Sequence, residues 1–162
     1  MIAKSAQDAK RFAAVADRYL KWVDDWADRP EENARAALGL LPELYLAALA
    51  LPNIWPDTPY DKRVSKEHHE RWKTLTTKFD SLPVRNYLNV FSPLERGDDE
   101  PVSCWLADDL ADIYLDLEEG LGYLEKGDAE QAIWVWRFGF WNHWGRHLVG
   151  ALSALHAFQS SY

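Results

Sequence analysis

The chain has 162 residues, 48% of them hydrophobic and nine of them tryptophan, so it is long enough to bury a core as one ordinary domain. It carries 18 basic and 26 acidic side chains, for a net charge of −8. Nucleic acids and anionic membrane surfaces are bound through clustered positive charge, which disfavours both as partners. We therefore expect an unidentified protein or small-molecule ligand as partner, with no nucleic acid and no membrane.

The single cysteine, Cys104, can form no disulfide within the chain, which favours a reducing compartment. No segment has the apolar run of a signal peptide or of a membrane-spanning helix. We expect a cytoplasmic protein whose residues 1–162 form a single helical domain.

Apolar residues at three- and four-residue spacing predict three helices in the N-terminal half, over residues 6–26, 30–51 and 62–82. Ser5 and Asp28 are the predicted caps of the first two. Pro42 removes a backbone donor, so we expect a kink or break near residues 40–41. Prolines between the second and third helices predict an extended loop, pinned to the body by Trp55.

The C-terminal half contains one ambiguous segment and two predicted helices. For residues 84–91 a short helix is favoured over a strand, because Tyr87, Leu88 and Phe91 would then share a face. Ser103 is the predicted cap of a helix over residues 104–126. Residues 92–101 read as a charged surface loop.

Gly127 is the predicted stop of that helix, and Asp128 the cap of a last helix that runs to about residue 159. This helix is unusually aromatic and long, with Gly139 and Gly145 as expected bends. The prediction is an all-α, single-domain bundle of five or six helices with a long aromatic C-terminal helix.

One face of the 104–126 helix is acidic, while leucines occupy the opposite face; its acids are Asp108, Asp109, Asp112, Asp116 and Glu119. The simpler interpretation is a solvated surface. Because like charges repel, the alternative is that the acids face a cation, either a divalent metal ion or the side chains of Arg137 and Arg146.

The last helix carries a second stripe beside its apolar core stripe, formed by Trp136, His143 and His147 with small residues between them. Two histidines four residues apart on a helix can share a metal ion. A histidine on a largely apolar helix is more often a hydrogen-bonded core residue. The pair becomes a candidate site only if the acidic helix packs against it, as the short connection at Gly127 suggests.

Three strings in the sequence are distinctive: LLPELYLAALALP, DDLADIYLDLEEGLGYLEKG and AIWVWRFGFWNHWGRHLVGALSALH. Together they resemble a family of bacterial domains of unknown function, catalogued under the number 5063. The resemblance implies a compact helical bacterial protein. It implies no established activity, so it supplies no catalytic residue.

We favour a binding or accessory protein-interaction module, because charged side chains lie amid aromatics without a recognisable catalytic constellation. Its predicted groove comprises Asp108, Asp109, Asp112, Asp116, Trp136, Arg137, His143, Arg146 and His147. No cofactor is required by this hypothesis.

Two alternatives stay open. The first is a metal-dependent hydrolase of a phosphate ester or nucleotide, whose divalent ion would be bound by Asp108, Asp109, Asp112, His143 and His147. The second is a purely structural network of aspartate, arginine and histidine with no active site.

Overall fold

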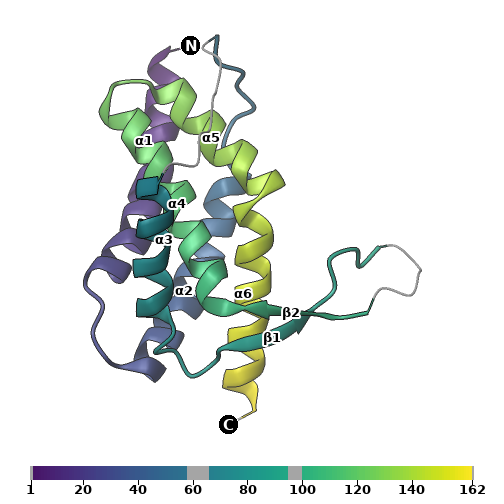
Figure 1. Cartoon of the computed structure of the whole chain (residues 1–162). Coiled ribbons are helices and arrows are strands. Elements are labelled where there is room, and N and C mark those ends of the chain that lie inside the picture. Colours follow the sequence, from purple (N-terminus) through teal and green to yellow (C-terminus); the bar gives the residue numbers. More distant parts are fainter. Residues whose placement is uncertain (1, 58–65, 95–99, 162) are drawn as a thin grey trace.

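The computed structural model describes residues 2–57, 66–94 and 100–161. Within these ranges it contains six helices and two short strands: α1 (Ile2–Asp24), α2 (Pro30–Leu49), α3 (Lys66–Phe79), β1 (Asn86–Asn89), β2 (Val102–Trp105), α4 (Leu106–Glu125), α5 (Ala129–Asn142) and α6 (Trp144–Ser160). The predicted all-α bundle is confirmed, with the strands as a small addition (Figure 1). Over the described ranges, no helix combines the length and the apolar character needed to cross a membrane.

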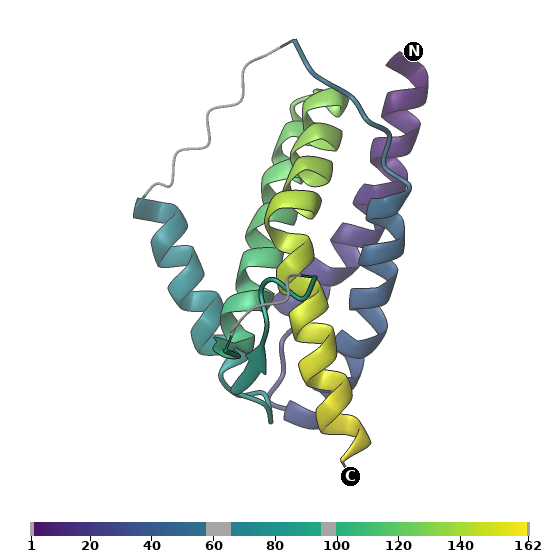
Figure 2. The same cartoon turned by 90° about the vertical axis from the view of Figure 1, so that its right-hand side faces the viewer.

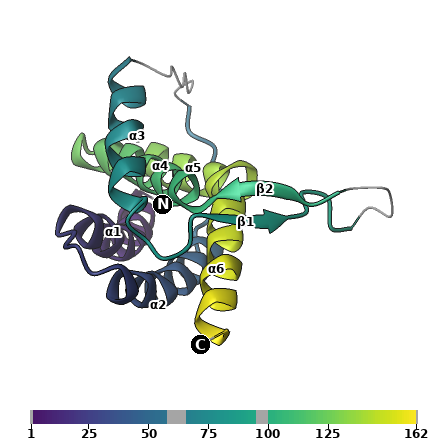
Figure 3. The same cartoon turned by 60° about the horizontal axis from the view of Figure 1, so that its bottom comes forward.

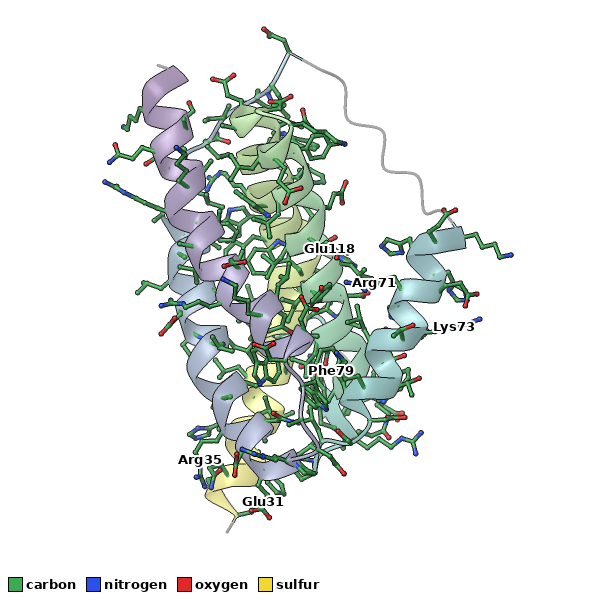
Figure 4. The ribbon with its side chains drawn as sticks, turned by 90° about the vertical axis from the view of Figure 1, so that its left-hand side faces the viewer. Glu31, Arg35, Arg71, Lys73, Phe79 and Glu118 are labelled. Atoms are coloured by element: carbon green, nitrogen blue, oxygen red, sulfur yellow. The ribbon has the colours of Figure 1, made fainter. Side chains whose placement is uncertain are left out.

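Helix α4 lies at the centre of the bundle and packs against α1, α3, α5 and α6. Helix α2 completes the opposite side through contacts with α1, α5 and α6. Helices α5 and α6 follow one another along one side of the bundle, with the two chain termini at opposite ends (Figures 1 and 2). Helix α3 joins through α4: Arg71 donates to Glu118 over 3.0 Å and to the Tyr114 hydroxyl over 2.8 Å (Figure 4).

Aromatic side chains from several helices fill the core. Trp136 and Trp144 are fully buried, and each indole finds a backbone acceptor: Trp136 Nε1 donates to the Leu117 carbonyl over 3.1 Å, and Trp144 Nε1 to the Trp136 carbonyl over 3.0 Å. A buried indole N–H without a partner would be costly, so these bonds fix both rings. Gly120 makes the packing feasible, since a Cβ there would lie 2.0 Å from Trp136 Nε1.

The predicted short helix over residues 84–91 is wrong. Residues Asn86–Asn89 form strand β1, which pairs antiparallel with β2 in the register Tyr87↔Cys104 and Leu88↔Ser103. Successive strand side chains point to opposite faces, so Tyr87 is half-buried against the bundle while Leu88 is exposed. The pairing partner lies beyond the intervening loop, and short-range periodicity does not detect it. The strands lie beside α6 and extend away from the bundle (Figures 1 and 3).

Three predicted helix caps are also wrong. Helix α1 already includes Ser5, Arg29 occupies the position before α2 that was assigned to Asp28, and Ser103 lies in β2. The helix predicted from residue 104 therefore begins two residues later, because the sheet takes the backbone groups of Ser103 and its neighbours. The predicted cap Asp128 is confirmed: its carboxylate accepts from the Gln131 amide over 3.0 Å, just after Gly127 at φ +84°.

The first three predicted helices differ from the structure in detail. Helix α2 runs without interruption through Pro42, so the predicted break is absent there. Trp55 is 74% exposed and does not pin the loop. The third helix ends at Phe79, three residues early, and residues 62–65 of its predicted range lie outside the described residues.

The predicted single C-terminal helix is wrong, because the chain breaks at His143. This residue has φ −144° and ψ −91°, and it closes α5 and precedes α6. Glycines on either side allow the two helix ends to approach closely. A Cβ on Gly139 would lie 2.8 Å from the Trp144 ring, and one on Gly145 would lie 2.1 Å from the Phe140 carbonyl oxygen. The break turns the His143 side chain towards α4.

Candidate functional site

The acidic face of α4 meets the histidines of the last two helices. Asp109, Asp112 and Asp116 lie on successive turns of α4, so their side chains form one row. His143 stands at the break, and His147 one turn into α6. Since α4 packs along α6, the row of carboxylates faces both imidazole rings.

His143 is held between two carboxylates. Its Nδ1 lies 2.6 Å from Asp116 Oδ2, and its Nε2 lies 3.6 Å from Asp112 Oδ2. The Asp116 side chain is only 6% exposed, whereas the His143 side chain is 45% exposed. A buried carboxylate therefore anchors a ring whose outer edge reaches solvent.

His147 repeats this arrangement one turn further along. Its Nδ1 lies 2.8 Å from Asp109 Oδ1, and its Nε2 lies 3.3 Å from Asp112 Oδ2. Asp109 is buried, and its second oxygen accepts a hydrogen bond from the Tyr87 hydroxyl over 2.7 Å. Tyr87 belongs to β1, so the strand pair supplies an outer support for the histidine.

The two imidazole rings make the same kind of contacts through their two nitrogens. An ionised carboxylate only accepts hydrogen bonds, so ionised Asp109 and Asp116 would keep a proton on Nδ1 of the histidine that each contacts. Each Nε2 is then directed at Asp112. One ring nitrogen of each histidine and one carboxylate oxygen of Asp112 lie within 4.8 Å of one another, and within the described ranges this is the group of side chains with metal-ligand spacing.

Burial and charge shape the titration of the same residues. Burial raises the pKa of Asp109, although hydrogen bonds from His147 and Tyr87 act in the opposite direction. Burial likewise raises the pKa of Asp112, against the lowering effect of His147. Burial lowers the pKa of His147, but the hydrogen bond to Asp109 and the charge of Asp112 outweigh it, and the net shift is upward. A proton on His147 Nε2 and a metal ion would compete for the same nitrogen.

Other residues of the predicted groove lie apart from this group. Trp136 is fully buried in the core, and Arg137 donates to the Leu51 carbonyl over 3.1 Å, away from the acidic row. Asp108 lies beside the group, where its Oδ1 accepts from Trp72 Nε1 over 3.0 Å. Arg146 is exposed, and in the part of the chain that the structure describes it forms no ion pair.

Tyr87 and Trp72 were not predicted as part of this region. Trp72 is partly buried against the core. Tyr87 reaches Asp109 only because its segment forms a strand. A Cβ on Gly150 would lie 2.2 Å from the Tyr87 hydroxyl oxygen, so this strand also requires a glycine in α6. No local pattern in the sequence signals either contact.

A pocket of about 1060 Å³ opens beside the two histidines. Its walls come from the strand pair, the first turns of α4 and α6, and the end of α5; residues from these walls include Tyr87, Phe91, Asp109, Trp141, His143, Arg146 and His147. The volume is at the upper end of the roughly 300–1,000 Å³ of small-molecule sites. Both imidazole rings are part of the pocket lining.

Residues 3–161 match the family model of DUF5063, described as a domain of unknown function. The chain therefore belongs to this family, and the suspected resemblance is confirmed. No curated protein matches the chain. Among solved structures, protein BF1032 from Bacteroides fragilis is similar, with a TM-score of 0.71 and 23% sequence identity over 93% of this chain and 94% of that one. This likeness shows a shared fold.

Proposed function

For this DUF5063 member we propose a metal-dependent hydrolytic function, with one divalent transition-metal ion bound by His143 Nε2, His147 Nε2 and the Asp112 carboxylate. One observation carries the proposal: both Nε2 atoms converge on the same Asp112 oxygen while both Nδ1 atoms are held by buried aspartates. Metal-binding histidines usually donate their other N–H to a carboxylate or carbonyl, which fixes the tautomer and the ring.

The distances support this ligand set. A metal ion bound at 2.0–2.1 Å places neighbouring ligand atoms roughly 2.8–3.0 Å apart in octahedral geometry and roughly 3.3–3.4 Å apart in tetrahedral geometry. The two Nε2 atoms lie 3.3 and 3.6 Å from Asp112 Oδ2. Small side-chain adjustments are enough to admit an ion, and Asp109 and Asp116 would stay in place as supports.

The surroundings favour hydrolysis. Two histidines and one carboxylate are a ligand set of hydrolytic zinc sites, in which the fourth position holds a water molecule. A metal ion lowers the pKa of that water to about 7 and polarises a carbonyl or phosphoryl oxygen. The exposed edge of His143 and the neighbouring pocket give such a water and a substrate room to bind. The same ligand types also suit Fe²⁺, so the identity of the metal is part of the test.

The test is metal binding by chelator-treated protein, measured by calorimetry and by the melting temperature with Zn²⁺, Fe²⁺, Mn²⁺, Co²⁺ and Mg²⁺. Ligand at 100 times its Kd stabilises a fold by about 2.7 kcal/mol, which raises the melting temperature of a domain this size by roughly 5–10 °C. We expect one equivalent of a transition metal to bind to wild type. His147→Ala should abolish binding.

His156→Ala is the matched control, because His156 is an exposed histidine on the same helix. It should bind metal as wild type does. If no ion shifts the melting temperature, or if both histidine variants bind equally, the proposal is wrong. Hydrolysis is then tested on metal-loaded wild type with a nitrophenyl phosphate and a nitrophenyl ester, with Asp112→Asn as the inactive comparison.

The interaction module predicted from the sequence stays a second candidate. The observation in its favour is a set of exposed apolar side chains on and near the strand pair, namely Leu88 at 72%, Phe91 at 57% and Leu94 at 96% exposure. Large exposed apolar residues often mark contact surfaces. The test is a binding assay with the immobilised protein. Wild type and Trp55→Ala should retain the same specific partner, and Leu88→Glu should lose it. Equal retention of the partner by all three proteins would count against this surface.

A further inference from the structure

Among the described residues that line the pocket beside the histidines, Arg146 is the one arginine or lysine. Arg146 lies three residues after His143, in the first turn of α6, and both residues line the pocket. Its guanidinium is exposed, and over the described residues no carboxylate pairs with it. The acids that share the pocket are engaged elsewhere: Asp109 with Tyr87 and His147, and Asp108 with Trp72.

The rest of the pocket is rich in aromatic side chains. Tyr45 packs edge-on against Phe140 with ring centroids 5.1 Å apart, and Phe140 packs against Trp141 at 5.0 Å. Trp141 and Phe91 are 54% and 57% exposed, and both line the pocket. Aromatic faces left open in a concave site offer contact area for an apolar or aromatic ligand body.

We infer that this pocket binds a small amphipathic anion: a carboxylate or phosphate group beside Arg146 and the histidines, joined to an aromatic or apolar body that lies against Trp141 and Phe91. The inference names the substrate class of the proposed function and rests on it for the role of the metal ion. An arginine fork matches the paired oxygens of a carboxylate or phosphate, and a metal ion one helical turn away would bind the same oxyanion.

The charge of the whole chain limits the size of the anion. With a net charge of −8, the protein repels an extended polyanion, and a single arginine cannot neutralise several phosphates. A ligand with one anionic head can pair with Arg146 and the bound metal ion, because the nearby carboxylates of Asp108 and Asp109 are hydrogen-bonded to other side chains. The pocket volume of about 1060 Å³ leaves room for the apolar body.

The experiment is isothermal titration of wild type, Arg146→Gln and Arg35→Gln, each with and without the bound divalent metal. Arg35 is an exposed arginine on α2 and is labelled in Figure 4. The Arg35→Gln variant controls for the loss of one positive charge. The anionic probes with a ring are phenylphosphonate and phenylacetate. Benzyl alcohol lacks the charge, and inorganic phosphate and acetate lack the ring.

We expect the two ring-bearing anions to bind at least about tenfold more tightly than benzyl alcohol, because a hydrogen bond to a charged group is worth about that factor or more. They should also bind at least about tenfold more tightly than the simple anions, which have no ring to lie against Trp141 and Phe91. Arg146→Gln should lose about tenfold, while Arg35→Gln keeps the wild-type affinity. The tighter of the two probes identifies the oxyanion.

Equal binding of benzyl alcohol, or unchanged affinity in Arg146→Gln, overturns the inference. Absence of metal uptake by wild type overturns the proposed function instead. The probe comparison then still decides this inference on metal-free protein, where Arg146 is the pocket's fixed cation. Metal uptake without preference for the ring-bearing anions overturns the substrate class alone.

Discussion

The contact between Tyr87 and Asp109 ties the strand pair to the histidines, and Tyr87→Phe removes it while keeping the ring. The hydroxyl donates over 2.7 Å to a carboxylate that is 5% exposed. A hydrogen bond to a charged group contributes roughly 1.5–3 kcal/mol to the free energy of unfolding, and more is lost when the acceptor is left buried. We expect a loss of about 2 kcal/mol, which lowers the melting temperature by roughly 4–8 °C.

The Tyr87→Phe variant also tests whether Tyr87 supports the metal-binding histidine or only stabilises the fold. If Tyr87 positions His147 through Asp109, the variant should also bind metal more weakly. Loss of a residue that hydrogen-bonds to a metal ligand typically lowers metal affinity by about 10–100-fold. The assay is a metal titration beside thermal unfolding. Tyr45→Phe is the matched control, because Tyr45 lines the same pocket and, within the described ranges, its hydroxyl has no hydrogen bond.

Two outcomes would refute this reasoning. If Tyr87→Phe melts at the wild-type temperature, the hydrogen bond contributes nothing to the native state. If it is destabilised but binds metal as tightly as wild type, Tyr87 holds the strand pair in place without affecting His147. Tyr45→Phe should change neither measurement.

Further predictions concern α4. Gly120→Ala should destabilise the fold by about 1–3 kcal/mol, because the new Cβ meets the Trp136 indole at 2.0 Å. Gly122→Ala, with nothing within 4 Å, should stabilise it by about 0.5–1 kcal/mol in thermal unfolding; the opposite order would refute the packing account. Asp116→Asn should weaken metal binding by about 10–100-fold by loosening His143, and unchanged affinity would show that Asp116 does not hold that ring.

Local periodicity accounts for much of what was predicted correctly. The carboxylates of α4 and the histidines at its partner helix were each singled out from spacing alone, since a helix places residues three and four apart on one face. Caps were less predictable. Asp128 acts as expected, but Ser103 does not, because it lies in a strand whose partner is β1. A strand partner distant in sequence overrides a local preference.

The helical class and the acidic face of α4 were accessible from the sequence, because each follows from the periodicity of a single helix. That the acidic face meets the two histidines depends on packing, since the contacts join residues 27 and 38 positions apart. The tertiary structure also decided that the chain breaks at His143, that Trp136 and Arg137 lie away from the site, and that Tyr87 supports it. Those outcomes depend on packing between elements, which no single segment encodes.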